Sequence, residues 1–489
     1  MLYSSTRGGD RDLHFRDTVL TGLARDGGLI LPQSVPDISA DLPRLAPLRY
    51  QDLAFEVMRL FADDIPEDDL RAIIGKSYAT FRDPLVTPLV PVGDLFVLEH
   101  FHGPTLAFKD LALQFLGNLF EYILSRDGRA LNIVAATSGD TGSAAIHGVR
   151  GKKGVSIFVL HPEGRVSPVQ ALQMTSVLDA NVHNLAVAGT FDDCQGIVKS
   201  LFADLPFKDA HSLGAVNSIN WARVLAQVVY YFFGAFRALE RTGATEVDFT
   251  VHTGNFGDVF AGYIAAKMGL PIRRLILATN ENDILDRCFK TGTYALGGVS
   301  ATLSPSMDIQ MASNFERWLY YFYGEDPAKT AAAMASFKAN GSLRLADGPI
   351  RDRWLSSGRA DTAETLEAIR STWREYGYLL DPHTAVGVAV ARKAQAGGSC
   401  GSGIPGRDGR AVPGERRPGG AEPPASAPQP PMVCLSTAHP AKFGAAILRA
   451  TGEDLAHHPA IDALQGAPTR VTHLPADREA VAAFVASQT

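Results

Sequence analysis

The stretch "LNIVAATSGDTGSAAIHGV", residues 131–149, runs from an apolar segment through a turn rich in Gly, Ser and Thr into a helical pattern. The same order recurs in "VSIFVLHPEG" from 155, "EVDFTVHTGNFGDVFAGYIAAKMG" from 246 and "RRLILATNENDIL" from 273. Near-continuous apolar strands that alternate with helices are typical of parallel sheets covered by helices on both faces. The sequence therefore predicts an α/β protein.

Two of the predicted strands end in turns that contain glycine, and ligands of open parallel sheets bind at the carboxyl ends of the strands. Hydroxyls and backbone N–H groups at a helix start can bind a carboxylate or a phosphate. An ordinary helix cap or tight turn explains the same residues, and the sequence alone leaves both interpretations open. The residues concerned are Thr137, Ser138, Asp140 and Thr141 in the first turn, and Gly254, Asn255, Phe256, Gly257 and Asp258 in the second.

Lys109, in "GPTLAFKD", follows a Gly-Pro turn at the predicted start of a helix. The helix dipole and apolar neighbours favour its neutral amine, a nucleophile that can form a Schiff base. An ammonium that extends to solvent beside Asp110 is the simpler interpretation of this segment by itself. The second turn lacks the Lys-Ser/Thr of a nucleotide loop and suits a single phosphate. Lys109 and the two turns together favour pyridoxal phosphate, an aldehyde that carries one phosphate.

Two further segments place polar side chains near predicted element ends. In "VNSINWARVLAQ", Asn217, Asn220 and Arg223 precede a long apolar helix, and Arg suits bidentate contact with a phosphate or carboxylate. Helix capping with a surface arginine is the alternative. In "LSTAHPAKFG", Thr437 follows a predicted strand, and its hydroxyl can hydrogen-bond a ring nitrogen. An ordinary turn explains that segment equally simply.

Composition and charge exclude several classes of function. The formal net charge is -6 with acids and bases interspersed, so no basic stripe is available for nucleic acid. The most apolar run, at 224–236, is too short for a membrane span, and charged residues near the N-terminus argue against an export signal. Four cysteines without pairing or zinc-ligand spacing suit a reducing cytoplasm. We therefore expect a cytoplasmic protein with no nucleic-acid partner, membrane span or metal site.

Element order and composition divide the 489-residue chain. We expect an N-terminal region at 1–94, and a smaller α/β domain at 95–200 with the Schiff-base lysine and the Ser-Gly-Asp-Thr turn. A larger α/β domain is expected from 201–395 and 432–489, with the phosphate turn. Residues 396–431 are roughly half Gly and Pro with few large apolar side chains, which predicts a disordered insertion.

With these residues assembled, the sequence resembles the threonine synthase family, which are pyridoxal-phosphate enzymes of fold type II. Ten motifs stand in the family's order and span nearly the whole chain: "YSSTRG", "DGGLILP", "FHGPTLAFKDLALQ", "TSGDTGSAA", "NSINWARVLAQ", "TGNFGD", "SPSMDIQ", "NFERWLY", "LDPHTAVG" and "STAHPAKF". The stretch at 396–431 departs from the compact family pattern. The resemblance implies two open, mostly parallel sheets covered by helices, with the active site in the cleft.

The resemblance also implies roles for individual residues. Lys109 is expected to hold the cofactor as a Schiff base and to shuttle protons, Asp140 to lie by the cofactor's ring oxygen, and Thr437 to bond the pyridine nitrogen. The implied phosphate cradle is Gly254, Asn255, Phe256, Gly257 and Asp258. The implied substrate ligands are Thr137, Ser138, Thr141, Asn217, Asn220 and Arg223.

The family converts O-phosphohomoserine and water into threonine and phosphate, by γ-elimination of phosphate and β-addition of water. The resemblance therefore implies a carbon–oxygen lyase of threonine biosynthesis, as a monomer or homodimer. Two alternatives remain from the sequence. One is a related phospholyase that acts on another phosphorylated amino compound, and the other is a non-catalytic ligand-binding relative.

Overall fold

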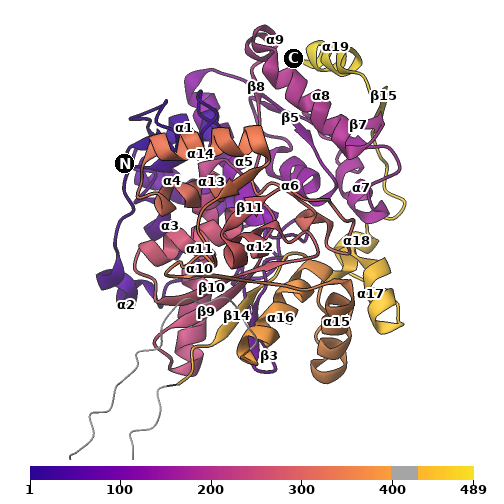
Figure 1. The fold of residues 1–489 in the computed structure, drawn as a ribbon. Helices are drawn as coiled ribbons and strands as arrows, with labels where there is room; N and C mark the ends of the chain where they lie inside the picture. Colours follow the sequence, from indigo (N-terminus) through magenta and orange to yellow (C-terminus); the bar gives the residue numbers. More distant parts are fainter. Residues whose placement is uncertain (398–427) are drawn as a thin grey trace, which may run out of the picture.

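A computed structural model of the chain describes residues 1–397 and 428–489 (Figure 1). The predicted insertion at 396–431 therefore lies almost entirely outside the described residues. Its two flanking elements are both present, since α16 (Pro382–Gln395) ends before it and β14 (Met432–Leu435) begins after it. These two elements pack against each other, as expected for consecutive parts of one sheet domain.

The larger sheet has six strands, and most neighbours in it are far apart in the sequence. All its pairs are parallel except the hairpin at one edge. Across the sheet the order is β13 (Leu355–Arg359), β10 (Ile272–Thr279), β9 (Val247–His252), β14, β4 (Leu95–Leu98) and β3 (Leu89–Val92). Every residue of β9 is buried, which explains its near-continuous apolar sequence because helices cover both faces of the sheet.

The smaller sheet has five strands, and all its pairs are parallel. Its order is β15 (Thr472–Pro475), β7 (Val182–Ala188), β6 (Val155–Pro162), β5 (Leu131–Ala136) and β8 (Leu213–Gly214). The strand and helix predicted at 131–149 are β5 and α6 (Asp140–Val149). The two parallel sheets with their covering helices confirm the predicted α/β class.

Sheet membership departs from the predicted domain boundaries for four strands. β3 lies within the predicted N-terminal region 1–94, but it pairs with β4 in the six-stranded sheet. The sequence assigns β4 to the smaller domain, but β4 pairs with β14 in the six-stranded sheet. It assigns β8 and β15 to the larger domain, but these strands pair with β5 and β7 in the five-stranded sheet. Strands pair through backbone groups that every apolar segment offers, so the sequence of one strand does not reveal which sheet it joins.

Helices lie over both sheets, and short two-stranded ribbons complete the fold (Figure 1). The helices nearest the predicted site residues are α5 (Lys109–Asp127), α6, α10 (Trp221–Thr242), α11 (Gly257–Lys267) and α16. The ribbons are β1 (Tyr3–Ser5) with β2 (Ile30–Pro32), and β11 (Thr293–Ala295) with β12 (Ser342–Arg344). Within residues 1–397 and 428–489, no helix is both long and apolar enough to cross a membrane.

The remaining described helices cover the sheets or belong to the N-terminal region. They are α1 (Phe15–Thr21), α2 (Leu42–Leu45), α3 (Tyr50–Met58), α4 (Glu67–Tyr78), α7 (Pro168–Thr175), α8 (Phe191–Ala203), α9 (Leu205–Ala210), α12 (Ile284–Thr291), α13 (Phe315–Phe322), α14 (Pro327–Asn340), α15 (Thr362–Tyr376), α17 (Gly444–Thr451), α18 (Pro459–Asp462) and α19 (Arg478–Gln488). α1 ends at Gly22, whose φ of +65° is the left-handed conformation that favours glycine. In the N-terminal region, α3 packs on α10 and α4 packs on α5.

α5 and α6 approach each other closely at a pair of glycines. A Cβ added at Gly117 in α5 would lie 1.9 Å from the carbonyl oxygen of Gly148 in α6. A Cβ at Gly148 would lie 2.5 Å from the carbonyl oxygen of Leu113. The backbones therefore touch without intervening side chains, and this contact fixes Lys109 at the start of α5 relative to Asp140 at the start of α6.

Gly117→Ala is expected to lower the free energy of unfolding by about 1–3 kcal/mol, because the new Cβ forces the two backbones apart. Gly75→Ala in α4 is the matched control, since its Cβ would meet no atom within 4 Å. This control is expected to raise the free energy of unfolding by about 0.5–1 kcal/mol. Urea unfolding followed by circular dichroism measures both changes. A Gly117→Ala protein as stable as the wild type would contradict the close contact.

Candidate active site

The loop before α5 and the chain after β14 are joined at the carboxyl ends of the strands. The Phe108 N–H donates to the carbonyl oxygen of Thr437 at 2.7 Å, and Ala107 forms an antiparallel bridge with Ala438. Because of these two contacts, Lys109 and Thr437 lie close together although they are far apart in the sequence. β5 and β9 belong to different sheets, but the carboxyl ends of both reach this region. Nζ of Lys109 lies 3.9 Å from Asp140, which follows β5, and the Phe108 ring lies 5.3 Å from the His252 ring at the end of β9, between centroids.

Lys109 is the first residue of α5, and its side chain is buried, with 7% of the residue exposed. Its Nζ lies 4.6 Å from the centroid of the Phe108 ring and has no hydrogen-bond partner among the described residues. Burial lowers the pKa of Lys109 to about 8, although the nearby Asp140 carboxylate opposes this shift. The interpretation of Lys109 as a solvent-exposed ammonium is therefore wrong.

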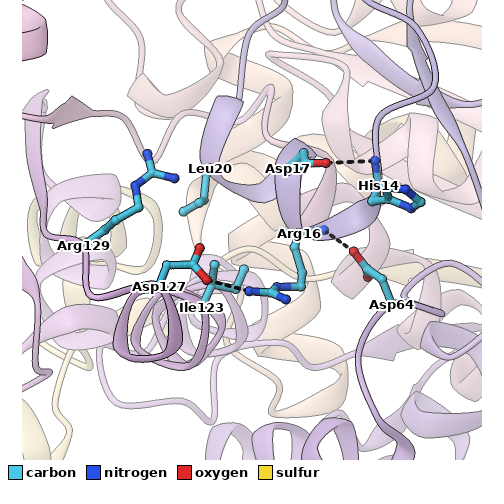
Figure 2. A pocket seen from close by; sticks show the side chains of 8 residues that line it. All are labelled: His14, Arg16, Asp17, Leu20, Asp64, Ile123, Asp127 and Arg129. Carbon is cyan, nitrogen blue, oxygen red and sulfur yellow. Dashed lines mark hydrogen bonds and ion pairs between the residues drawn. The ribbon is translucent and has the colours of Figure 1, made fainter.

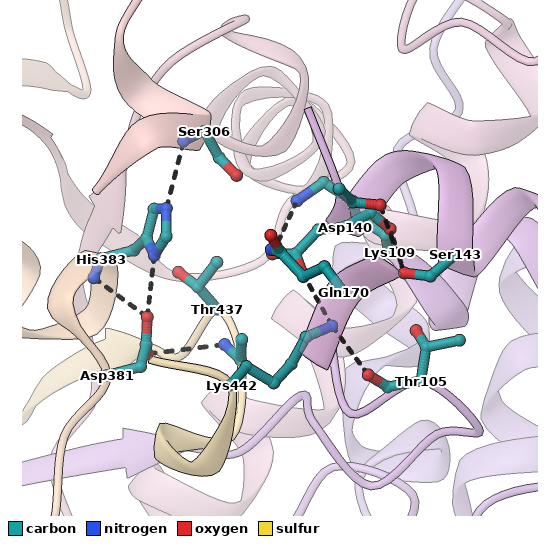
Figure 3. A network of polar contacts seen from close by, with 12 residues as sticks. Thr105, Lys109, Asp140, Ser143, Gln170, Ser306, Asp381, His383, Thr437 and Lys442 are labelled. Atoms are coloured by element: carbon teal, nitrogen blue, oxygen red, sulfur yellow. Dashed lines mark hydrogen bonds and ion pairs between the residues drawn. The ribbon is translucent and has the colours of Figure 1, made fainter. Parts of the chain in front are cut away.

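Asp140, the first residue of α6, lies between two lysines (Figure 3). Its Oδ2 is 3.9 Å from Nζ of Lys109, and its Oδ1 is 2.7 Å from Nζ of Lys442. The same Oδ1 accepts a hydrogen bond from Nε2 of Gln170 at 2.8 Å. Burial alone would raise the pKa of Asp140, but Lys442 and Lys109 hold it well below its usual value. The carboxylate is therefore ionised at neutral pH.

Lys442 is a site residue that the sequence analysis missed. It ends the short 3-10 helix η3 (Pro440–Lys442), and its side chain is fully buried. The only signal in the sequence is a lysine among small and apolar residues in "STAHPAKFG". Such a lysine also suits an exposed loop, so the pattern does not reveal its buried partner Asp140.

The turn after β5 is held together by its own hydroxyl and glycine. Oγ1 of Thr137 accepts hydrogen bonds from the N–H groups of Gly139 at 3.0 Å and Gly142 at 2.8 Å. Gly139 has a φ of +141°, and a Cβ there would lie 2.3 Å from the side chain of Gln170. Ser138 is exposed and Thr141 is partly exposed, so their hydroxyls are accessible to a small ligand.

The turn after β9 is shaped by two unusual positions. A Cβ on Gly254 would lie 2.8 Å from the carbonyl oxygen of Ser306, so only glycine fits there. Phe256 has a left-handed φ of +64° while its buried ring packs edge-on against Phe315, at 5.6 Å between centroids. Asn255 is exposed at the tip. Because the first N–H groups of α11 have no partners within the helix, this turn can bind an anion.

The carboxylate of Asp258 is bonded to α10 through one of its oxygens. Its Oδ1 accepts hydrogen bonds from the hydroxyls of Tyr230 at 2.6 Å and Tyr231 at 2.9 Å, both in α10. Burial raises the pKa of Asp258 to about 6, although the two tyrosines oppose this shift. Any contribution of Asp258 to a phosphate cradle is therefore limited to its backbone N–H group.

The polar residues at the start of α10 differ in their burial and in their contacts. Oδ1 of Asn220 accepts a hydrogen bond from the N–H of Ala222 and caps α10, and its Nδ2 donates to the carbonyl oxygen of Val19 at 2.9 Å. The capping alternative is thus confirmed for Asn220, whose side chain is occupied by protein contacts. Arg223 is buried rather than on the surface, and burial lowers its pKa to about 10. Asn217 is exposed.

A buried polar network supports Thr437 from the start of α16 (Figure 3). The N–H of Thr437 donates to Oγ1 of Thr384 at 3.0 Å, and Thr384 in turn donates to Asp381. Nδ1 of His383 lies 3.0 Å from Asp381, and its Nε2 accepts a hydrogen bond from the N–H of Ser306 at 3.2 Å. The network therefore connects Thr437 with the loop that packs against Gly254. The sequence analysis missed Asp381, His383 and Thr384, although they stand in "LDPHTAVG".

The described residues fit pyridoxal phosphate at three points. Nζ of Lys109 and Oγ1 of Thr437 are buried polar atoms without hydrogen-bond partners in the described part of the chain. They are the two atoms expected to contact the cofactor's aldehyde carbon and ring nitrogen. The third point is the crowded turn at Gly254, where the first N–H groups of α11 have no partners within the helix and suit a phosphate.

A cavity of about 380 Å³ lies elsewhere, beside α1 and the end of α5 (Figure 2). Arg16 donates to Asp127 at 2.8 Å there, and its backbone N–H donates to Asp64 at 2.9 Å. None of the predicted site residues lines this cavity. Its lining residues are His14, Arg16, Asp17, Leu20, Asp64, Ile123, Asp127 and Arg129.

Comparison with known proteins gives matches along the whole chain. Three family models match it: "Threonine synthase N terminus" at residues 2–78, "Pyridoxal-phosphate dependent enzyme" at 83–404 and "Threonine synthase, C-terminal" at 421–485. Threonine synthase of Methylobacillus glycogenes is 43% identical over 503 residues, covering 99% of each chain. Threonine synthase of Saccharomyces cerevisiae is 45% identical over 484 residues, covering 91% of this chain and 88% of the relative.

A solved structure agrees with these sequence matches. The X-ray structure of pyridoxal-phosphate-bound threonine synthase from Brucella melitensis has a TM-score of 0.90 at 44% identity, with 100% of this chain and 99% of the other covered. The full length of the chain thus matches one group of enzymes. This chain also contains the two sheets, the buried Lys109 and the turns after β5 and β9. The chain belongs to the threonine synthase family of pyridoxal-phosphate-dependent enzymes.

Proposed function

We propose that the chain is a threonine synthase, which converts O-phospho-L-homoserine and water into L-threonine and phosphate. One observation carries the proposal: the buried amine of Lys109 lacks a hydrogen-bond partner among the described residues, beside the equally unpartnered hydroxyl of Thr437. Full-length relatives named threonine synthase supply the reaction. In it the Cγ–O bond breaks and phosphate leaves, one proton is lost from Cβ and one is added at Cγ, the hydroxyl of water adds at Cβ, and the other proton of water leaves with the phosphate.

Three parts of the site would hold the cofactor, which supplies an aldehyde for amines and a ring that withdraws electrons when it is bound. Lys109 would bond the aldehyde carbon covalently. The hydroxyl of Thr437 would hydrogen-bond the ring nitrogen, in a position fixed by Thr384. Backbone N–H groups between Gly254 and Asp258 would bind the phosphate, helped by the positive end of the α11 dipole.

Lys109 is also the base that the reaction needs. An ordinary lysine with a pKa near 10.4 is almost fully charged at neutral pH, whereas a pKa of about 8 leaves a useful neutral fraction. Once the substrate has displaced it from the cofactor, the neutral amine can accept the proton from Cα and return protons to the product. Asp140, 3.9 Å away, stabilises the ammonium that forms.

The two anionic groups of the substrate would be bound at different parts of the site. Ser138 and Thr141 stand at the start of α6, where hydroxyls, N–H groups and the helix dipole favour a carboxylate. Thr137 supports this turn through its hydroxyl. Arg223 is a candidate ligand for the substrate phosphate, because its buried Nε has no hydrogen-bond partner within the described residues.

We also propose a cytoplasmic location for the enzyme. Cys194, Cys288 and Cys434 are buried free thiols, and burial raises the pKa of each. Unpaired cysteines suit a reducing compartment. Fluorescence microscopy of a tagged protein tests this location, and light scattering of the purified protein tests the predicted monomer or homodimer.

The protein loaded with pyridoxal phosphate is expected to release phosphate and threonine in equal amounts from O-phosphohomoserine. Lys109→Ala is expected to lower turnover about 10³-fold or more, because the base and the covalent attachment are both lost. Lys338→Ala, on an exposed part of α14, is the control and should keep full activity. Phosphate release with a keto acid and no threonine would identify a phospholyase instead. Full activity of Lys109→Ala would exclude the proposed chemistry.

The rate at which the apoprotein takes up pyridoxal phosphate is expected to rise with pH and to level off just above pH 8. The reacting form is the neutral amine, and burial of Lys109 lowers its pKa to about 8, so half of the amine is already neutral at that pH. An exposed lysine would give a rate that keeps rising to about pH 10. Stopped-flow absorbance of the bound cofactor measures the profile. A continued rise through pH 10 would contradict the buried environment of Lys109.

Gly254→Ala is expected to weaken the binding of pyridoxal phosphate about tenfold, because the Cβ must push away the Ser306 carbonyl. Gly298→Ala is the matched control, since a Cβ at Gly298 meets no atom within 4 Å. Equilibrium titration of each apoprotein with the cofactor, followed by fluorescence, measures both affinities. Equal affinities in the two variants would show that the turn at Gly254 does not bind the phosphate.

A further inference from the structure

We propose that Lys442 is a positioning residue for the reaction. Its ammonium holds the Asp140 carboxylate in place beside Lys109, and thereby keeps a larger part of the Lys109 amine neutral. The inference rests on the proposed function, because it takes Lys109 as the lysine that bonds the cofactor and moves protons.

Lys442 is a buried lysine with specific partners rather than a surface lysine. Its side chain is fully buried, and Nζ reaches Oδ1 of Asp140 at 2.7 Å and the carbonyl oxygen of Thr105 at 2.9 Å. Figure 3 shows the side chain directed at both partners. Oδ2 of Asp140 has no hydrogen-bond partner in the described part of the chain and lies 3.9 Å from Nζ of Lys109. Each oxygen of the Asp140 carboxylate thus faces one lysine, Oδ1 facing Lys442 and Oδ2 facing Lys109.

Thr105 connects Lys442 to the loop that carries Lys109. The N–H and hydroxyl of Thr105 both donate to Asp110, at 2.8 and 2.7 Å, and Asp110 directly follows Lys109. The carbonyl oxygen of Thr105 also accepts a hydrogen bond from Gln173 at 3.0 Å. Lys442 therefore touches the loop before α5 on one side and the start of α6 on the other.

Lys442 changes the balance of charges around Lys109. With Lys442 present, the single Asp140 carboxylate is shared by two ammonium groups, so a proton on Lys109 is only partly compensated. Without Lys442, Lys109 and Asp140 would form a neutral ion pair, which favours the protonated amine. The charged or titratable groups that face Lys109 are Asp140, Lys442, Arg223, Asp381 and His252. Of these, Asp140 and Asp381 favour the ammonium, whereas Lys442 and Arg223 oppose it.

Lys442→Met removes the charge while it retains an unbranched side chain. The midpoint of the pH profile for cofactor uptake by the apoprotein is expected to move upward by about one pH unit. Turnover at pH 7 should fall about tenfold and recover at higher pH, since fewer Lys109 amines are neutral at pH 7. Lys442→Arg keeps the charge, so its midpoint should stay near that of the wild type.

A double-mutant cycle shows whether Lys442 acts through Asp140. In an Asp140→Asn background, Lys442→Met is expected to move the midpoint by less than it does alone, because the shared carboxylate is absent. An equal shift in both backgrounds would show a direct effect of Lys442 on Lys109 and overturn the positioning role.

Lys152→Met is the matched control for the loss of a largely buried lysine. Lys152 donates to Oδ1 of Asn118 at 2.6 Å and is remote from the site, so this variant should lose stability without a change of midpoint. If Lys442→Met does not fold, Lys442→Gln keeps a donor for Thr105 and carries the same expectation. A folded variant of either kind with the wild-type midpoint would overturn the proposal.

A separate experiment tests the proposed function. Borohydride reduction of the wild-type holoenzyme followed by peptide mapping should place the cofactor on Lys109. A label on another residue would contradict the assignment of Lys109 itself. A label on Lys109 together with an unchanged midpoint in Lys442→Met would contradict only the role of Lys442.

Discussion

The amine of Lys109 lies inside the protein without a hydrogen bond from the described residues, and burial of an isolated cation is unfavourable by several kcal/mol. The Asp140 carboxylate compensates part of this charge, and Lys442 and Gln170 hold that carboxylate. The contact between Phe108 and Thr437 then fixes the loop before α5 against β14. The groups around one amine therefore join segments that follow strands of both sheets, β5 in one and β14 in the other.

Local signals in the sequence were sufficient for the fold class and for much of the site. The apolar strands β5 and β9, their glycine turns and the helix that begins at Lys109 each follow from neighbouring residues. The positive φ of Gly139 is also a local feature, whereas the lack of space at Gly254 comes from the distant Ser306 carbonyl. Local properties depend on a few consecutive residues, and for that reason a single sequence expresses them.

Features that depend on distant contacts could not be predicted. Lys442 acquires its role only because α6 brings Asp140 to it, and the Asp258 carboxylate is bound by tyrosines of α10. Asn220 is occupied because the N-terminal region presents the Val19 carbonyl. The sheet that β4 joins is set by β14, far along the chain. In each case the partner residue, rather than the residue itself, decides the outcome.

Residues 398–427 are flanked by α16 and β14, and the ends of these two elements next to them lie far from the active site. α16 starts beside Thr437 and extends about 21 Å over its 14 residues, and β14 returns about 13 Å over four residues. Residues 398–427 are therefore joined to the rest of the chain at the end of the sheet opposite to the catalytic edge. A fused domain or affinity tag could be carried at the same place.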